Sequence, residues 1–152
     1  MKTTLLILFV LVWSSCAEKY DKAATAKIDQ TVKTLKQEKR FTDAVEKIYF
    51  VNIDAGCESC IDECLTFIKK EQHNNRLLFV IESAHKNTVA KVSSQYSLKI
   101  VPDNCIVIDN ELVGYKNGLV DVFPKVFYVK NKKVMDTKSI DASNIDKLLV
   151  SN

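Results

Sequence analysis

Apolar and polar residues alternate along this chain in the pattern of an α/β protein. Residues 47–53, 76–81 and 104–108 form short, nearly continuous apolar runs. Such runs are typical of strands that are covered on both faces of a sheet. The segments between them, 57–71 and 86–98, carry apolar residues at helical spacing. The order therefore predicts strand, helix, strand, helix and strand.

The remaining C-terminal part predicts a hairpin followed by a helix. Residues 125–129 and 132–136 are apolar-rich runs on either side of the polar pair Lys130-Asn131, which indicates an antiparallel hairpin. Asp141 or Ser143 then supplies the N-cap of a closing helix. Together these elements predict an α/β fold in which helices cover both faces of a central mixed sheet.

Two further segments add to this frame. Residues 111–122 are less regular, and we expect a loop with one helical turn. Residues 19–40 predict an added N-terminal helix, because Ile28, Val32 and Leu35 recur at helical spacing. The lysines between them either form a solvated face, which we favour, or touch anionic lipid. This helix either spaces the domain from an anchor or packs against its side.

The strongest chemical signal is Cys57-Glu58-Ser59-Cys60, which stands where a predicted strand turns into a helix. The dipole and free N–H groups of a helix N-terminus stabilise a thiolate on the first cysteine. The second cysteine follows one turn later and can close a disulfide with it. In this position the pair indicates redox chemistry rather than half of a zinc site.

The first residues indicate export. Lys2 precedes an apolar run at 5–13 that is too short to span a bilayer, and Ser14-Ser15-Cys16 follows. Residues 1–15 therefore predict a signal peptide whose end resembles the lipobox of bacterial lipoproteins, which implies lipidation of Cys16. The alternative is ordinary cleavage after Ala17, which would discard Cys16. In both cases the protein leaves the cytosol and disulfides can persist.

Length and charge limit the other classes of function. The chain has 152 residues, and we expect residues 16–46 to hold the anchor cysteine and the N-terminal helix and residues 47–152 to form one domain. The net charge of +3 gives no case for nucleic-acid binding. We expect a monomer.

Residues 47–150 resemble the thioredoxin superfamily. Two motifs carry the resemblance, Gly56-Cys57-Glu58-Ser59-Cys60 and the proline-led apolar strand 122–129. With the lipoprotein signal, the chain looks most like lipid-anchored thioredoxin-like proteins of the TlpA and redoxin type. The resemblance implies that Pro124 is cis and that Phe123 and Pro124 shape a substrate groove. It also implies a bacterial envelope location, with the outer membrane favoured because Ala17 follows the cysteine.

The chain departs from the family at several positions. Gly56 stands where thioredoxins usually have Trp, and Phe123 stands where they usually have Thr or Val. Val51 occupies the position of a buried acid that helps to move protons from the second cysteine. Glu58 beside the nucleophile disfavours the thiolate through like-charge repulsion, so we expect a higher pKa for Cys57 than in strongly oxidising relatives.

The other cysteines and the histidines leave alternatives open. Cys64 and Cys105 either form a structural disulfide or, as we favour, remain buried free thiols. The overlapping CxxC and CxxxC spacing resembles copper-carrying thioredoxin-fold proteins, which also need a histidine near the site. We expect His73 and His85 to lie far from the dithiol, so we expect neither a metal nor a cofactor.

The resulting expectation is a lipid-anchored thiol-disulfide oxidoreductase. Cys57 would attack a protein disulfide and Cys60 would resolve the mixed disulfide. Its partners would be a protein thiol or disulfide substrate, a redox partner that the sequence does not identify, and the membrane through the lipid. The alternative is a non-catalytic thioredoxin-fold binding or assembly lipoprotein, because fold alone does not decide function.

Overall fold

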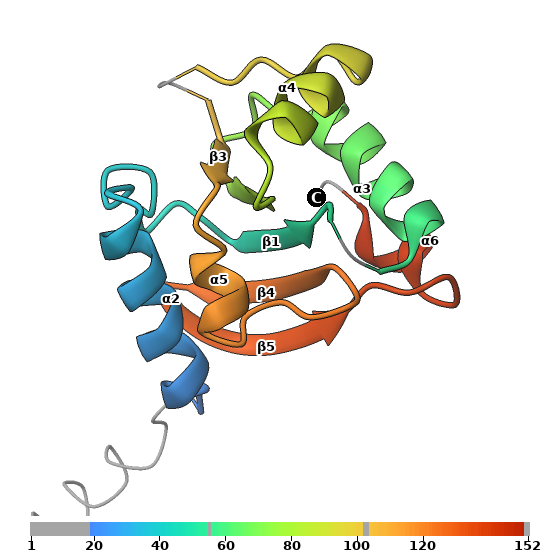
Figure 1. Cartoon of the computed structure of the whole chain (residues 1–152). Helices are drawn as coiled ribbons and strands as arrows, with labels where there is room; N and C mark the ends of the chain where they lie inside the picture. Colours follow the sequence, from blue (N-terminus) through green and yellow to red (C-terminus); the bar gives the residue numbers. More distant parts are fainter. Residues whose placement is uncertain (1–18, 55, 102–103, 151–152) are drawn as a thin grey trace, which may run out of the picture.

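A mixed five-stranded sheet forms the centre of the computed structural model, which describes residues 19–54, 56–101 and 104–150 (Figure 1). The strand order is β3-β2-β1-β4-β5. Strands β1, β2 and β3 run parallel, whereas β4 is antiparallel to both β1 and β5. The strands are β1 (Lys47–Asn52), β2 (Leu77–Glu82), β3 (Ile106–Asp109), β4 (Lys125–Lys130) and β5 (Lys133–Ser139). The expected signal peptide and the expected lipidation of Cys16 lie outside the described residues.

Helices cover both faces of this sheet, as Figure 1 shows. They are α2 (Lys22–Thr34), α3 (Glu58–Glu71), α4 (Lys86–Gln95), α5 (Val113–Lys116) and α6 (Ile145–Leu148). Two apolar cores result, one facing α3, α4 and α6, the other facing α2. The predicted α/β class, with a mixed sheet between helices, is confirmed, and the arrangement is compatible with a thioredoxin-like fold.

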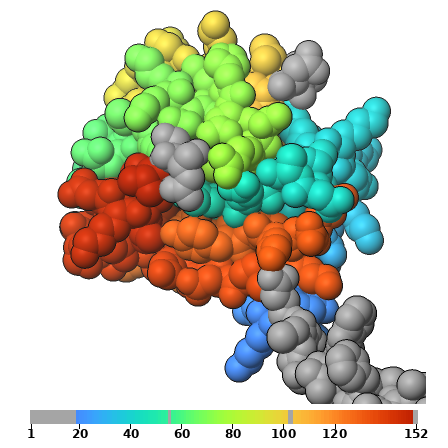
Figure 2. Space-filling model, turned by 180° about the vertical axis from the view of Figure 1, so that it is seen from behind, coloured from blue at the N-terminus to red at the C-terminus, as the bar shows by residue number. Residues whose placement is uncertain are grey.

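The first core is built around aromatic side chains. The ring of Tyr49 lies 5.5 Å from that of Phe67 on α3 and 5.3 Å from that of Phe79 on β2, measured between centroids. The hydroxyl of Tyr49 donates a 3.1 Å hydrogen bond to the carbonyl of Leu148. This bond satisfies the polar end of a ring that is otherwise buried. It also fixes the C-terminal segment, which Figures 1 and 2 both show beside α3.

The N-terminal helix packs against the side of the domain. Asp21 caps it by accepting a 2.9 Å hydrogen bond from the amide of Ala24, and Ile28 and Val32 are buried in the second core. The helix is shorter than expected and ends at Thr34. The chain reverses at Lys36, where φ is 55°. This early end lets the following connection enter the core, where Phe41 is only 3 % exposed.

Other boundaries shift by a few residues. The β4–β5 turn is centred on Asn131 and Lys132, whose φ values of 48° and 61° suit a two-residue hairpin turn, rather than on Lys130 and Asn131. The closing helix is a single turn that follows Asn144. Asp141 instead accepts hydrogen bonds from the amide and hydroxyl of Ser143. Residues 111–122 contain one helical turn, α5, as expected.

Candidate functional site

Cys57 and Cys60 form a disulfide at the N-terminus of α3, with their Cα atoms 5.2 Å apart. Cys57 is the N-cap residue, and its Sγ accepts a 3.3 Å hydrogen bond from the amide of Cys60. Cys57 is half-buried, whereas Cys60 is only 1 % exposed. An incoming thiolate can therefore reach the sulfur of Cys57 but not that of Cys60.

The turn before the disulfide is held by polar side chains at the end of β1. The carboxylate of Asp54 accepts a 2.7 Å hydrogen bond from the hydroxyl of Ser83 and a 2.6 Å bond from the amide of Ala84. The side chain of Asn52 accepts a 3.0 Å bond from the amide of Asp54. These bonds tie the β1–α3 turn to the β2–α4 turn. Sequence reasoning missed Asp54, since only pairing of β1 with β2 brings Ser83 beside it.

Gly56 brings this turn against the segment that precedes β4. Its φ is 105°, and a Cβ there would overlap the backbone carbonyl of Val122. Only glycine combines this conformation with such a close approach. The disulfide and the proline-led segment are therefore neighbours, although 66 positions separate Gly56 from Val122. The structure thus brings together the two motifs on which the thioredoxin resemblance rests.

The two residues before Pro124 present apolar surface. Val122 is 56 % exposed and Phe123 is 39 % exposed, whereas Pro124 is buried. The carbonyl of Pro124 accepts a 2.7 Å hydrogen bond from Ile140, and Lys125 pairs with Asp121 at 2.7 Å. The peptide bond between Phe123 and Pro124 is trans, which differs from the cis bond implied by the family resemblance. The amide of Phe123 donates a 3.1 Å hydrogen bond to Asp121, and this bond, the Lys125 ion pair and the bond from Ile140 hold the segment on both sides of the proline.

Two polar side chains lie between the cysteines of the CxxC motif. Glu58 is exposed on the first turn of α3. The hydroxyl of Ser59 lies 3.2 Å from the Sγ of Cys57. A serine hydroxyl can donate to a thiolate and thereby stabilise it, which opposes the repulsion expected from Glu58. Sequence reasoning gave Ser59 no role, although its place within the motif was the available signal.

Val51 is apolar and 1 % exposed, and it packs in the core that faces α3. The buried acids lie on the other side of the sheet. Glu82 and Asp109 are paired across β2 and β3, and both are 0 % exposed. Asp109 accepts a 3.0 Å hydrogen bond from the amide of Gly114. A Cβ at Gly114 would overlap the carboxylate of Glu82, so α5 sits directly against it.

Burial, together with the neighbouring charge of Asp109, raises the pKa of Glu82 to about 8. A carboxyl group in this state holds its proton at neutral pH. Sequence reasoning missed this residue. Its only signal was an acidic residue directly after the apolar run at 77–81.

Cys64 and Cys105 are free, buried thiols and do not form the structural disulfide considered from the sequence. Cys64 is 1 % exposed on α3, and burial raises the pKa of its thiol to about 12. Cys105 is 8 % exposed, and burial raises the pKa of its thiol to about 11. Neither thiol is therefore a ready nucleophile, because the thiolate is the reactive form.

The part of the chain described here holds no group of three or more His, Cys, Asp or Glu residues arranged to bind a metal ion. His73 follows the C-terminal end of α3. Because this helix is 14 residues long, His73 lies about 20 Å from the first turn, where the dithiol is. The backbone of His85, at the N-cap of α4, is linked to the β1–α3 turn through Ser83. Its amide donates to the hydroxyl of Ser83, which in turn bonds Asp54 of the β1–α3 turn.

No protein-family model matches the chain, and no curated protein matches it. Within residues 19–54, 56–101 and 104–150, no helix has the length and apolar character needed to cross a membrane.

Proposed function

We propose that this protein is a thiol-disulfide oxidoreductase that acts on protein thiols and disulfides through Cys57 and Cys60. The observation that carries the proposal is the disulfide at the N-terminus of α3, with Cys57 half-buried and Cys60 only 1 % exposed. This asymmetry gives the two sulfurs different tasks. The accessible sulfur exchanges with a substrate, and the protected one resolves the intermediate.

In the reducing direction, the Cys57 thiolate attacks one sulfur of a substrate disulfide. A mixed disulfide forms, and the first substrate thiolate leaves. The Cys60 thiol loses its proton and attacks the Sγ of Cys57, so the second substrate thiolate leaves and the internal disulfide forms. Two electrons pass from the protein dithiol to the substrate. The oxidising direction is the reverse, and it begins with attack of a substrate thiolate on the accessible Sγ of Cys57.

The substrate would lie over the segment before β4. Val122 and Phe123 are exposed apolar side chains, and the backbone of Val122 touches Gly56 immediately before Cys57. An apolar residue beside the substrate cysteine would pack there. The buried Pro124 would hold this surface in place rather than contact the substrate directly.

We further propose that the protein works in the bacterial cell envelope, held by a lipid on Cys16, with the outer membrane favoured. This rests on the resemblance of residues 1–16 to a lipoprotein signal. Metabolic labelling with palmitate tests it. The natural chain should incorporate label and fractionate with membranes, whereas Cys16→Ser should do neither. Label retained by Cys16→Ser would contradict the assignment.

One observation favours a second candidate, a non-catalytic binding module. Val51 stands where the thioredoxin resemblance expects a buried acid, and it packs among apolar residues in the core that faces α3. Without a nearby proton acceptor, Cys60 would resolve mixed disulfides slowly. A module of this kind would keep its disulfide as a structural link.

Equilibration of the Cys57–Cys60 pair with dithiothreitol or glutathione separates the two candidates. An exchange enzyme should show one reversible two-electron transition between about −270 and −120 mV, and it should reduce insulin. Cys57→Ala should abolish insulin reduction, whereas Cys105→Ala, a matched cysteine outside the site, should retain it. A potential well below about −300 mV or activity in Cys57→Ala would contradict the proposal.

A further inference from the structure

A pocket lies at the N-terminal ends of the parallel strands, at the opposite end of the sheet from the disulfide. Its volume is about 600 Å³. Its walls come from the connection before β1, the α3–β2 turn and the entry to β3, all at the N-terminal ends of the parallel strands. Cys57 instead follows the C-terminal end of β1, whose six residues span about 20 Å. The pocket is therefore separate from the proposed redox site.

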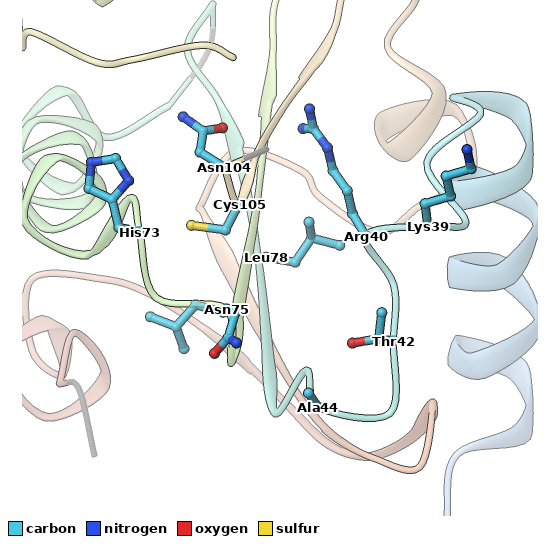
Figure 3. A pocket seen from close by; sticks show the side chains of 10 residues that line it. Lys39, Arg40, Thr42, Ala44, His73, Asn75, Leu78, Asn104 and Cys105 are labelled. Carbon is cyan, nitrogen blue, oxygen red and sulfur yellow. The ribbon is translucent and has the colours of Figure 1, made fainter. Parts of the chain in front are cut away.

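The polar groups that line this pocket are cationic or neutral, and no described carboxylate is among them. Lys39 and Arg40 come from one wall, and His73 and Asn104 come from the others. Figure 3 shows the four side chains side by side across the view, in the order His73, Asn104, Arg40 and Lys39, each extending toward its top. Such a lining favours a negatively charged ligand.

Arg40 is the fixed charge of the pocket. Its guanidinium donates a 3.2 Å hydrogen bond to the carbonyl of Val101 and a second bond to the carbonyl of Ile106. These neutral acceptors hold the half-buried side chain in place. No carboxylate pairs with it among the described residues. A guanidinium fixed in this way is ready to bind an oxyanion without further ordering of the side chain.

Asn104 adds an independent sign of a missing ligand. Its side chain is 6 % exposed, and its Oδ1 accepts a 3.0 Å hydrogen bond from the amide of Ile106. That bond fixes which end of the amide is the oxygen. The Nδ2 donor has no acceptor among the described residues. Buried donors normally have partners, so this one calls for an acceptor that the described residues do not supply.

We propose that this pocket binds a small oxyanion, the phosphate or carboxylate group of a soluble ligand. Arg40 supplies the fixed positive charge, and Asn104 supplies a neutral donor that a purely electrostatic surface would lack. Lys39 and His73 close the rim on either side. The proposal is independent of the redox chemistry at Cys57 and Cys60, because the pocket and the disulfide lie at opposite ends of the parallel strands.

Titration of the purified protein with inorganic phosphate, and separately with acetate, tests the proposal by two-dimensional NMR at constant ionic strength. We expect saturable shifts at the backbone amides of Arg40, His73 and Asn104 and at the side-chain amide of Asn104. Saturation by phosphate identifies a phosphoryl ligand, and saturation by acetate alone identifies a carboxylate. An absence of saturable shifts with both anions would overturn the proposal.

Matched variants separate a built site from general charge attraction. Lys39→Gln should weaken binding about threefold, whereas Lys36→Gln removes the same charge from the same connection outside the pocket and should leave binding unchanged. Equal weakening in both would overturn the proposal. Asn104→Asp keeps the acceptor for Ile106 but replaces the donor by a negative charge that repels the anion, so it should weaken binding at least about tenfold. If Asn104→Asp does not fold, the comparison of Lys39→Gln with Lys36→Gln decides whether the pocket binds the anion.

Discussion

Replacing Glu82 by Gln tests the most unusual electrostatic feature of the fold. The side chain is 0 % exposed, and burial together with Asp109 raises its pKa from an ordinary 4.5 to about 8. The folded protein therefore holds a proton on Glu82 across a pH range in which the unfolded chain releases it. Because the folded state binds more protons, stability falls as the pH rises from about 4.5 to about 8.

The size of the effect follows from the shift. Each pKa unit corresponds to about 1.4 kcal/mol, so the full shift is worth at most about 5 kcal/mol. That is a large part of the 5 to 15 kcal/mol by which an ordinary domain is stable, roughly a third or more. Glu82→Gln removes the titration, and its amide can donate to Asp109. The variant should therefore gain stability over the natural protein progressively as the pH rises.

Urea unfolding at about pH 5, 6.5 and 8 measures this difference. The free energy of unfolding of the natural protein should fall steadily relative to that of Glu82→Gln. Glu111→Gln is a suitable control, because Glu111 is exposed, and its curve should run parallel to that of the natural protein. Parallel curves for Glu82→Gln and the natural protein over the whole range would refute the reasoning, since Glu82 would then not titrate on folding.

Two further predictions concern the redox site. Gly56→Ala should destabilise the fold by at least about 2 kcal/mol and change the reduction potential of the disulfide. The reason is that φ at Gly56 is 105° and a Cβ there would overlap the carbonyl of Val122. Gly118→Ala is the control, because Gly118 has a φ of 69° but only Lys27 nearby, so it should lower the free energy of unfolding by less in the same urea experiment. Equal costs at the two glycines would argue against the close approach of Gly56 to Val122. In the reduced protein, Ser59→Ala should raise the pKa of Cys57, because the substitution removes the hydroxyl that lies 3.2 Å from the sulfur. Glu58→Gln should lower the pKa of Cys57, because it removes a neighbouring negative charge. The pH dependence of alkylation by iodoacetamide measures both shifts, and an unchanged profile in Ser59→Ala would show that the contact does not persist in the dithiol form.

Local patterns were enough to predict the elements that build the sheet. Continuous apolar runs predicted β1 and β2, because strands buried on both faces need apolar side chains at every position. Helical spacing predicted α3 with the dithiol at its start, and it predicted Cys57 as the accessible cysteine of the pair. These features depend on neighbours within a few residues along the chain, so a sequence pattern contains them.

Features that depend on contacts between distant segments came only from the folded chain. The approach of Gly56 to Val122 requires β1 and β4 to pair, and the pocket around Arg40 requires three connections to meet at one edge of the sheet. The protonation of Glu82 likewise follows from α5 and Asp109 enclosing it. The sequence alone does not specify the environment of a buried carboxyl group. Its pKa is set by the dielectric and charges that packing brings to it, and those exist only in the tertiary structure.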